Sequence, residues 1–230
     1  NGIDGRSVIL DSAANHYSMY KEAMTEQEVA PCSTCKIIST LMGLEKGVIE
    51  NEEARMSYNG TQHPVAAWNQ DLTLGEAVQT SCVWYFRQII DMVGETEVRQ
   101  GLEVLSYGNC DISQWAGNEV NPGEDLNGFW ISSSLKISPY QQVQVLRQIF
   151  EGESPYEAGD VEILKNVMLV EAGSEQSIYG KTGSGAEGEA WFVGFSEAEG
   201  QRTYFAFCLI EQNVSGSTAK EIALEVIKSM

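Results

Sequence analysis

The chain has 230 residues, of which 43% are hydrophobic and 20% are charged, as expected for one soluble globular domain with a proper core. Its 33 acidic and 14 basic residues give a formal net charge of −19, which argues against nucleic acid and anionic membranes as partners. No apolar run approaches the roughly 18 residues of a membrane span. No signal peptide is visible, and the start at Asn1 indicates a trimmed mature domain.

The first predicted elements are a hairpin and a helix. Residues 7–11 and 17–20 have the composition of two short strands joined by a turn. Apolar residues then recur at helical spacing over 32–44, and Gly47 follows as a stop signal. A β-hairpin followed by a long helix is therefore predicted for the first fifth of the chain.

The middle of the chain is predicted to be helical. Thr73-Leu74-Gly75-Glu76 is a capping box that opens the helix delivering Ser81. Ser138-Pro139-Tyr140-Gln141 combines an N-cap, a proline at the first helical position and a box glutamine. The remaining helices are predicted over 83–93, 95–105 and 161–170, and the one after Ser138 is predicted to end near residue 150.

The last part of the chain changes to strand-like periodicity. Segments 177–182, 190–195 and 203–210 are short, rich in aromatic and β-branched residues, and separated by glycine and acidic turns. Residues 204–209 are apolar on both faces, which predicts a central strand covered by helices on each side. Thr218-Ala219-Lys220-Glu221 is taken as the capping box of a final helix. The buried stripe of this helix is predicted to be Ile222, Val226 and Ile227.

Strands at both ends of the chain and helices between them define the fold class. We predict an α/β (α+β) fold in which an antiparallel sheet is flanked by helices and joined to a helical lobe. The whole chain, 1–230, forms one domain. Its sheet lobe is predicted at about 1–31 and 172–230 and its helical lobe at about 32–171. The oligomeric state stays open.

Cysteine and histidine give little support for a metal site or a bound cofactor. Cys32 and Cys35 form one C-x-x-C, but no second pair follows, and His16 and His63 are isolated. The total of five cysteines leaves at least one thiol unpaired. No metal is therefore predicted.

The cysteines are expected to serve mainly as packing residues. Cys35 should point away from Ser33 into the core, where a thiol behaves as a small hydrophobe, and Cys82 and Cys208 are interpreted in the same way. A disulfide between Cys32 and Cys110 is left open, because connectivity cannot be deduced from sequence.

Two separated motifs carry the chemistry. In Ser33-Thr34-Cys35-Lys36, a helix places the Ser33 hydroxyl and the Lys36 amine on one face. A desolvated lysine can lose its proton and then accept that of the serine, which activates a nucleophile. Ser33 alone could be a helix cap, but Lys181-Thr182-Gly183 downstream favours catalysis. Together the motifs indicate a serine acyl-transferase that reacts with penicillin.

Further short motifs narrow the family. They are Ser81-Cys82-Val83, Tyr107-Gly108-Asn109, Phe129-Trp130-Ile131 and Leu135-Lys136-Ile137-Ser138. With the Ser-Thr-x-Lys motif, they make the chain resemble the class D β-lactamases, the oxacillinases, from about Ser7 to the C-terminal helix. The resemblance implies a β-lactam as the small-molecule substrate and an extracytoplasmic location.

The resemblance also implies roles on the helical side of the site. Ser33 is the nucleophile, and Lys36 is carboxylated by carbon dioxide to a carbamate that acts as general base, with no freely bound cofactor. Val83 and Ile131 wall its apolar pocket. The indole N–H of Trp130 donates to the carbamate, although plain core packing is the alternative for this residue.

Other roles concern proton transfer and the oxyanion. Ser81 shuttles a proton between Ser33 and the β-lactam nitrogen, its alternative being an ordinary serine inside a helix. The backbone N–H groups of Ser33 and Ser184 form the oxyanion hole. Tyr107 and Asn109 border the site, where they either fix a loop or touch the substrate.

Carboxylate binding is expected from the downstream motif. Lys181 and Thr182 bind the substrate carboxylate, and Gly183 permits close approach of the strand edge. Many class D enzymes also have an arginine near the start of the last helix, and residues 215–220 contain none. Recognition must then rest on Lys181, Thr182, Ser184 or Lys220, at an expected loss of about 1–3 kcal/mol.

Two alternatives to a β-lactamase share these motifs. The sensor domains of β-lactam receptors stay acylated, and the missing arginine slightly favours them, whereas Trp68-Asn69-Gln70-Asp71 fits both groups. Sensors tend to have asparagine at the position of Val83, so Val83 favours turnover. A cell-wall transpeptidase or carboxypeptidase is disfavoured, because Ser-x-Asn is usual there and the chain is short.

Overall fold

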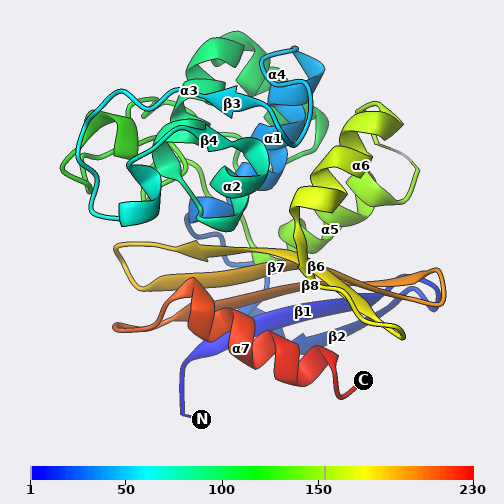
Figure 1. The fold of residues 1–230 in the computed structure, drawn as a ribbon. Helices are drawn as coiled ribbons and strands as arrows, with labels where there is room; N and C mark the ends of the chain where they lie inside the picture. The colour runs from blue at the N-terminus through cyan, green and yellow to red at the C-terminus, as the bar shows by residue number, and fades with distance from the viewer. Residues whose placement is uncertain (1, 153) are drawn as a thin grey trace.

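A six-stranded antiparallel sheet forms the base of the molecule in the computed structural model, which describes residues 2–152 and 154–230 (Figure 1). Its strand order is β2-β1-β8-β7-β6-β5, so the two ends of the chain meet in the middle of the sheet. The strands are β1 (Gly5–Asp11), β2 (His16–Tyr20), β5 (Leu169–Glu171), β6 (Ser177–Ser184), β7 (Glu189–Ala198) and β8 (Gln201–Ile210).

Helices cover both faces of this sheet. Figure 1 shows α7 across one face and the other helices on the opposite side. The helices are α1 (Lys36–Glu45), α2 (Leu74–Gln79), α3 (Val83–Val93), α4 (Glu95–Val104), α5 (Pro139–Phe150), α6 (Ala158–Val167) and α7 (Gly216–Ile227). A two-stranded sheet of β3 (Arg55–Met56) and β4 (Leu72–Thr73) lies within the helical part. The predicted fold class is confirmed.

The central strand β8 joins two hydrophobic cores. It pairs with β1 on one side and β7 on the other. Because side chains alternate along a strand, Phe205 and Phe207 enter the core beneath α7, whereas Tyr204 and Ala206 enter the larger core beneath the helical lobe. This two-sided burial explains why residues 204–209 are apolar throughout.

The C-terminal end of α6 differs from the prediction. The helix ends at Val167, and Leu169–Glu171 forms the edge strand β5, so the predicted helix over 161–170 is wrong at its end. Leu169 pairs with Tyr179 of β6, and this strand partner outweighs the helical pattern of a short apolar run.

The start and the buried face of α7 also differ from the prediction. The helix begins at Gly216, with Ser215 as its cap, rather than after Thr218. Its fully buried residues are Gly216, Ala219, Ala223 and Ile227, while Ile222 is half-buried and Val226 is 36% exposed. Ile227 is buried as predicted, whereas small residues face the sheet near the start of α7, where a Cβ on Gly216 would lie 2.8 Å from Gly183 O.

All five cysteines are free thiols, so the disulfide left open between Cys32 and Cys110 does not form. The two thiols point to different carbonyls: Cys32 Sγ lies 3.5 Å from Ala30 O and Cys110 Sγ lies 3.5 Å from Tyr107 O. Within the described ranges, no helix is long and apolar enough to cross a membrane.

Candidate active site

The nucleophile turn lies where the chain enters the helical lobe. Residues Cys32–Cys35 form a 3₁₀ turn (η2), and α1 continues from Lys36. Lys36 Nζ lies 2.7 Å from Ser33 Oγ, so the pair meets as the motif predicts, although Ser33 lies in a 3₁₀ turn rather than an α-helix. The Thr34 hydroxyl donates to Pro31 O at 2.7 Å and accepts from Gln142 at 2.9 Å, which fixes the turn beneath the nucleophile.

Lys36 lies in an almost dry, largely apolar pocket. Only 1% of the residue is exposed, its ammonium lies 5.5 Å from the centre of the Phe86 ring, and Val83 and Ile131 are both buried. The nearby thiols of Cys82 and Cys35 are uncharged, because burial raises their pKa. Burial lowers the pKa of Lys36 to about 8, because the charged amine loses its hydration. A substantial neutral fraction therefore exists near physiological pH.

The contacts of four tryptophans help to position the site. Trp68, Trp84 and Trp191 each donate to a backbone carbonyl at 2.8–3.0 Å. Trp130 is 1% exposed, and its ring packs edge-on against that of Phe129, with ring centroids 5.0 Å apart. Its carbonyl accepts from Cys32 N at 3.0 Å, which places this tryptophan beside the nucleophile turn.

Ser81 lies in the short link between α2 and α3, outside the helical run in which it was expected. Its backbone is left-handed, with φ 55°, a conformation that costs a non-glycine residue roughly 1 kcal/mol or more and that commonly marks a functional position. The link is held because the Trp68 indole donates to Thr80 O at 3.0 Å. In this position, Ser81 Oγ accepts from Lys181 Nζ at 2.9 Å.

Lys181 reaches from β6 to the helical lobe. It is 4% exposed, and its amine contacts Ser81 Oγ, Thr182 O and Thr182 Oγ1 at 2.9, 3.0 and 3.4 Å. Burial holds its pKa well below the usual value, and the charges of Lys36 and Lys220 lower it further. Three oxygen atoms of the protein therefore take the place of water around this amine.

The edge of β6 approaches the nucleophile turn very closely. A Cβ atom on Gly183 would lie 3.1 Å from Pro31 O and 3.4 Å from Ser33 N. Only a glycine lets the strand pass at this distance without displacing the turn. The next residue along the strand is Ser184, and its hydroxyl accepts from Gly216 N at 2.9 Å.

Tyr107 and Asn109 support the site from behind rather than lining it. Tyr107 is buried, and its hydroxyl accepts from Gln142, the residue that also holds Thr34. Asn109 ties two loops together: its amide donates to Ser134 O at 2.9 Å and its oxygen accepts from Lys136 N at 3.0 Å. Both contacts correspond to the loop-fixing alternative.

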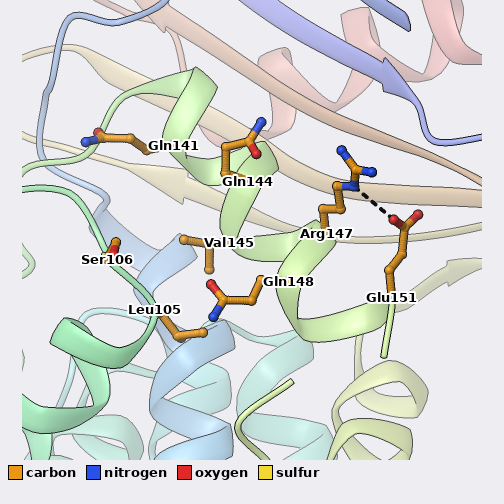
Figure 2. A pocket seen from close by; sticks show the side chains of 8 residues that line it. All are labelled: Leu105, Ser106, Gln141, Gln144, Val145, Arg147, Gln148 and Glu151. Carbon is orange, nitrogen blue, oxygen red and sulfur yellow. Dashed lines mark hydrogen bonds and ion pairs between the residues drawn. The ribbon is translucent and has the colours of Figure 1, made fainter. Parts of the chain in front are cut away.

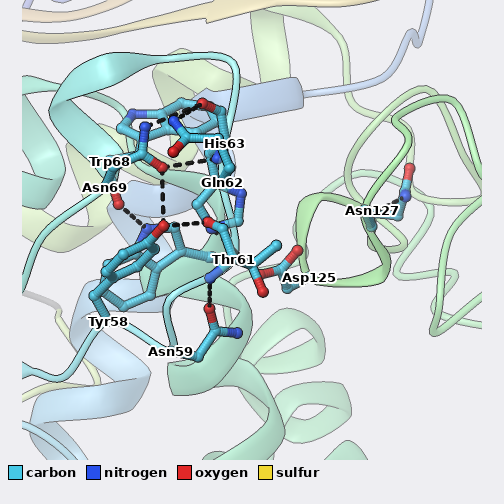
Figure 3. Close-up of polar contacts among 11 residues, drawn as sticks. Tyr58, Asn59, Thr61, Gln62, His63, Trp68, Asn69, Asp125 and Asn127 are labelled. Atoms are coloured by element: carbon cyan, nitrogen blue, oxygen red, sulfur yellow. Dashed lines mark hydrogen bonds and ion pairs between the residues drawn. The ribbon is translucent and has the colours of Figure 1, made fainter.

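The Trp68-Asn69-Gln70-Asp71 motif organises a loop on the flank of the helical lobe (Figure 3). The Asn69 oxygen accepts from His63 N at 2.7 Å and from the Tyr58 hydroxyl at 3.2 Å, and its amide donates to His63 O. His63 Nε2 in turn lies 3.5 Å from Asp125 Oδ2. The motif therefore positions Trp68, whose indole holds the Ser81 link.

Two cavities lie at very different distances from this chemistry. A polar hollow of about 550 Å³ between the end of α4 and α5 is lined mainly by glutamines, Arg147 and Glu151, and contains none of the site residues (Figure 2). A cavity of about 340 Å³ lies beside β6 and includes Lys181, Thr182 and Lys220 in its wall. Of these two cavities, only the smaller one is lined by predicted site residues.

Sequence reasoning did not identify one residue and two contacts of this site. Phe86 beneath Lys36 is one helical turn after Val83, so its spacing was a usable signal. The bond from Trp68 to Thr80 and the approach of Lys220 to Lys181 join segments far apart in the chain, and no local pattern indicates them.

Comparison with known proteins identifies the family. Over residues 7–228 the sequence matches the family described as the penicillin binding protein transpeptidase domain. Since this match spans nearly the whole chain, the protein belongs to the penicillin-binding transpeptidase domain family.

Similar proteins include both enzymes and receptors. The regulatory protein BlaR1 of Bacillus licheniformis is 32% identical over 97% of this chain, which covers only 36% of that protein. The probable β-lactamase YbxI of Bacillus subtilis (strain 168) is 31% identical over 98% of this chain and 80% of that protein.

Solved structures give the same two groups. The class D β-lactamase from Bacillus subtilis superposes with a TM-score of 0.90 at 32% identity, covering 99% of this chain and 92% of that one. The C-terminal domain of the Bacillus licheniformis BlaR penicillin-receptor superposes with a TM-score of 0.89 at 31% identity, covering 98% and 89%. The predicted resemblance to class D β-lactamases is confirmed, and likeness alone does not separate enzyme from receptor.

Proposed function

We propose that this protein is a class D serine β-lactamase that hydrolyses the β-lactam amide of penicillins through an acyl-enzyme on Ser33. The observation that carries the proposal is the 2.7 Å contact between Ser33 Oγ and a lysine amine in an apolar pocket, with the pKa of that lysine lowered to about 8. A nucleophile next to a base of this kind is the central requirement of covalent hydrolysis.

In the proposed acylation, Ser33 Oγ attacks the β-lactam carbonyl carbon and its proton moves to the Lys36 side chain. The backbone N–H groups of Ser33 and Ser184 bind the developing oxyanion, and each such donor is worth about 10²–10³ in rate. When the carbon–nitrogen bond breaks, the β-lactam nitrogen takes a proton from Ser81, and Ser81 recovers the proton that Lys36 took from Ser33, so the net transfer is from Ser33 to the leaving nitrogen. Because Ser81 Oγ accepts from Lys181, its own O–H is free to donate.

In the proposed deacylation, water attacks the ester carbonyl and Ser33 leaves with a proton. We further propose that Lys36 is carboxylated by carbon dioxide and that the carbamate supplies the general base for this water. The pocket fits such a group, since it is apolar and its amine has a lowered pKa. We propose that the indole N–H of Trp130 donates to the carbamate. Enrichment with ¹³C-bicarbonate should give a carbamate carbon resonance in the parent that Lys36→Met lacks.

Intact-mass spectrometry tests the nucleophile. Brief exposure to benzylpenicillin should add one drug mass to the parent and none to Ser33→Ala. Ser39→Ala is the matched control, because Ser39 lies further along the same helix and its hydroxyl contacts Cys35, donating to Cys35 O at 3.0 Å. An adduct that survives Ser33→Ala would contradict the assignment.

The second candidate is a β-lactam sensor domain that is acylated but not turned over, and the match to BlaR1 specifically favours it. Val83 weighs against it, because no polar side chain at this position competes for the Lys36 group. A nitrocefin time course separates the two: an enzyme continues far beyond one turnover, whereas a sensor gives one stoichiometric burst.

We also propose an extracytoplasmic location, in keeping with the receptor domain among the structural relatives.

A further inference from the structure

The edge of β6 and the turn that follows it are bonded to the helical lobe at two points. At the first point, Lys181 Nζ contacts Ser81 Oγ at 2.9 Å. At the second point, just beyond the end of the strand, Ala186 N donates to Ser132 Oγ at 3.1 Å. Gly183, the residue that passes against the nucleophile turn, lies between these two points. The segment 181–186 is therefore held at both of its ends.

Ser132 directly follows Ile131 and has a strained backbone. Its φ is 44°, in the left-handed region that costs a non-glycine residue free energy and often marks a functional position. The residue is 5% exposed, and its carbonyl accepts from Asn118 Nδ2 at 2.9 Å. Two positions earlier in the chain, Trp130 O accepts from Cys32 N at 3.0 Å, so the same loop is also bonded to the nucleophile turn. The Ser132 hydroxyl is therefore an acceptor on a firmly held loop.

The turn between β6 and β7 receives one of its hydrogen bonds from outside the sheet. Gly185 N donates to Glu189 O at 2.8 Å, and Glu187 N donates to Glu189 Oε2 at 3.1 Å, so these two N–H groups are satisfied within the hairpin. Ala186 N, between them, donates instead to Ser132 Oγ of the helical lobe. The last residue of β6 directly precedes this turn, so a shift of the turn would also shift the end of the strand.

We propose that Ser132 is a positioning residue for the oxyanion hole. By accepting the Ala186 N–H, its hydroxyl fixes the end of β6 so that the Ser184 N–H points at the oxyanion formed on attack by Ser33. A donor of this kind stabilises the transition state most when it is held in place before the charge develops. In this role Ser132 acts through the turn rather than on the substrate. The inference rests on the proposed acylation of Ser33.

Two substitutions separate positioning from stability. Ser132→Ala and Ser132→Gly both remove the hydroxyl, but alanine keeps a Cβ at a left-handed φ, whereas glycine adopts this φ without strain. Both variants should lose about tenfold in the second-order rate of Ser33 acylation by benzylpenicillin, measured by intact mass, because a misaimed donor loses part of its effect on the rate. The thermal unfolding midpoint should be higher in Ser132→Gly than in Ser132→Ala.

A transition-state analogue gives a readout that a loss of stability would not move. When Ser33 Oγ bonds to the boron of an arylboronic acid and passes its proton to the base, no group leaves, and a boron-bound hydroxyl takes the place of the oxyanion. The affinity for this acid should fall about tenfold in both Ser132 variants, in parallel with the acylation rate. The pH profile of acylation should keep its parental shape, since Lys36 sets it.

Ser106→Gly is the matched control. Ser106 also has a left-handed backbone, with φ 49°, but it lines the polar hollow between α4 and α5, away from the site. The substitution therefore makes the same chemical change at a distant position. It should leave the acylation rate and the affinity for the boronic acid at their parental values.

Parental acylation rates or parental boronic acid affinities in both Ser132 variants would overturn the assignment. A rate loss that is larger in Ser132→Ala than in Ser132→Gly would overturn it as well, because the loss would then follow stability. A shifted pH profile would show that Ser132 acts through Lys36 instead. If the parent protein is not acylated at Ser33, the proposed function itself is wrong. Because acylation and boronic acid binding are the readouts, the test is unaffected by whether the acyl group is later hydrolysed.

Discussion

Lys36 on the helical side of the site and Lys181 on the sheet side are buried almost equally, with 1% and 4% of their surfaces exposed. Their surroundings differ. Within residues 2–152 and 154–230, Ser33 Oγ is the one hydrogen-bond partner of the Lys36 amine, which otherwise lies near the Phe86 ring and uncharged thiols. Lys181 is surrounded by three oxygen atoms from Ser81 and Thr182.

The comparison shows that burial lowers the pKa of both amines, but the neighbouring groups decide what each can do. An amine with one partner can react, either with the serine proton or with carbon dioxide. An amine with three partners is fixed and can only polarise or relay. The following experiments test this difference, from the largest expected effect to the smallest.

Removing the reactive amine should give the largest effect. In Lys36→Met, turnover should fall by about 10³-fold or more, as expected when a general base is lost. In buffer depleted of carbon dioxide, the same variant should be more stable at pH 7 by at most about 3 kcal/mol, because the pKa of Lys36 is lowered from 10.5 to about 8. Steady-state kinetics and thermal unfolding measure the two changes.

The stability gain should depend on pH in a defined direction. Well below pH 8 the folded and unfolded states both carry the Lys36 proton, so the full cost of the buried charge is present. Between about pH 8 and 10.5 the folded state is neutral first, and the parent gains stability as pH rises. The difference in the free energy of unfolding between Lys36→Met and the parent should therefore shrink as the pH rises from about 8 to 10.5. Lys46→Met, an exposed change, should leave turnover unaltered, and equal rates in Lys36→Met and the parent would contradict the mechanism.

Acidification should give the next largest effect, a loss of activity in the parent protein. With a pKa of about 8, the neutral fraction of Lys36 falls about tenfold per pH unit below 8, to about one hundredth at pH 6. Turnover at pH 6 should drop accordingly and recover when bicarbonate is added, since carbon dioxide reacts only with the neutral amine. Initial rates across pH 6–9 with and without bicarbonate are the measurement. A complete absence of bicarbonate effect would mean that Lys36 works as a plain amine.

A polar neighbour should make Lys36 behave more like Lys181. In Val83→Asn, an amide at the pocket wall competes for the Lys36 group, so deacylation should slow by about 10–100-fold while acylation changes less than tenfold. Single-turnover acylation and recovery of free protein by intact mass give the two rates. Val83→Ile keeps the wall apolar and should retain most activity. Deacylation at the parental rate in Val83→Asn would remove the argument for an enzyme over a sensor.

Much of this site could be predicted from local pattern. The Ser33–Lys36 contact depends on residues three apart, and capping boxes at Thr73 and Ser138 are set by neighbours in the chain. What could not be predicted depends on packing between distant segments. The small-residue face of α7 reflects its contact with β6, and the strand state of Leu169 depends on its pairing with Tyr179.

The same limit applies to the roles of the two lysines. The Lys-Thr-Gly motif states which residues are present but not that Ser81 and Thr182 would occupy the whole Lys181 amine. It likewise cannot place Lys220, which is almost forty positions away in the chain, beside the same cavity. Sequence motifs show which reactive groups are present, and the contacts made in the tertiary fold decide what each group can do.

The smallest expected effect concerns the link that brings Ser81 to Lys181. In Trp68→Phe, Thr80 O loses the indole donor at 3.0 Å, which should cost about 1 kcal/mol of stability. Because the link then holds Ser81 less well, kcat should fall several-fold with little change in KM. Trp84→Phe is the matched control: it loses an indole bond of 2.8 Å to Trp68 O, two steps from Ser81 rather than one. Trp84→Phe should lower the free energy of unfolding by a similar amount but should lower kcat less than Trp68→Phe does. An equal loss of kcat in both variants would show that the Ser81 link does not depend specifically on Trp68.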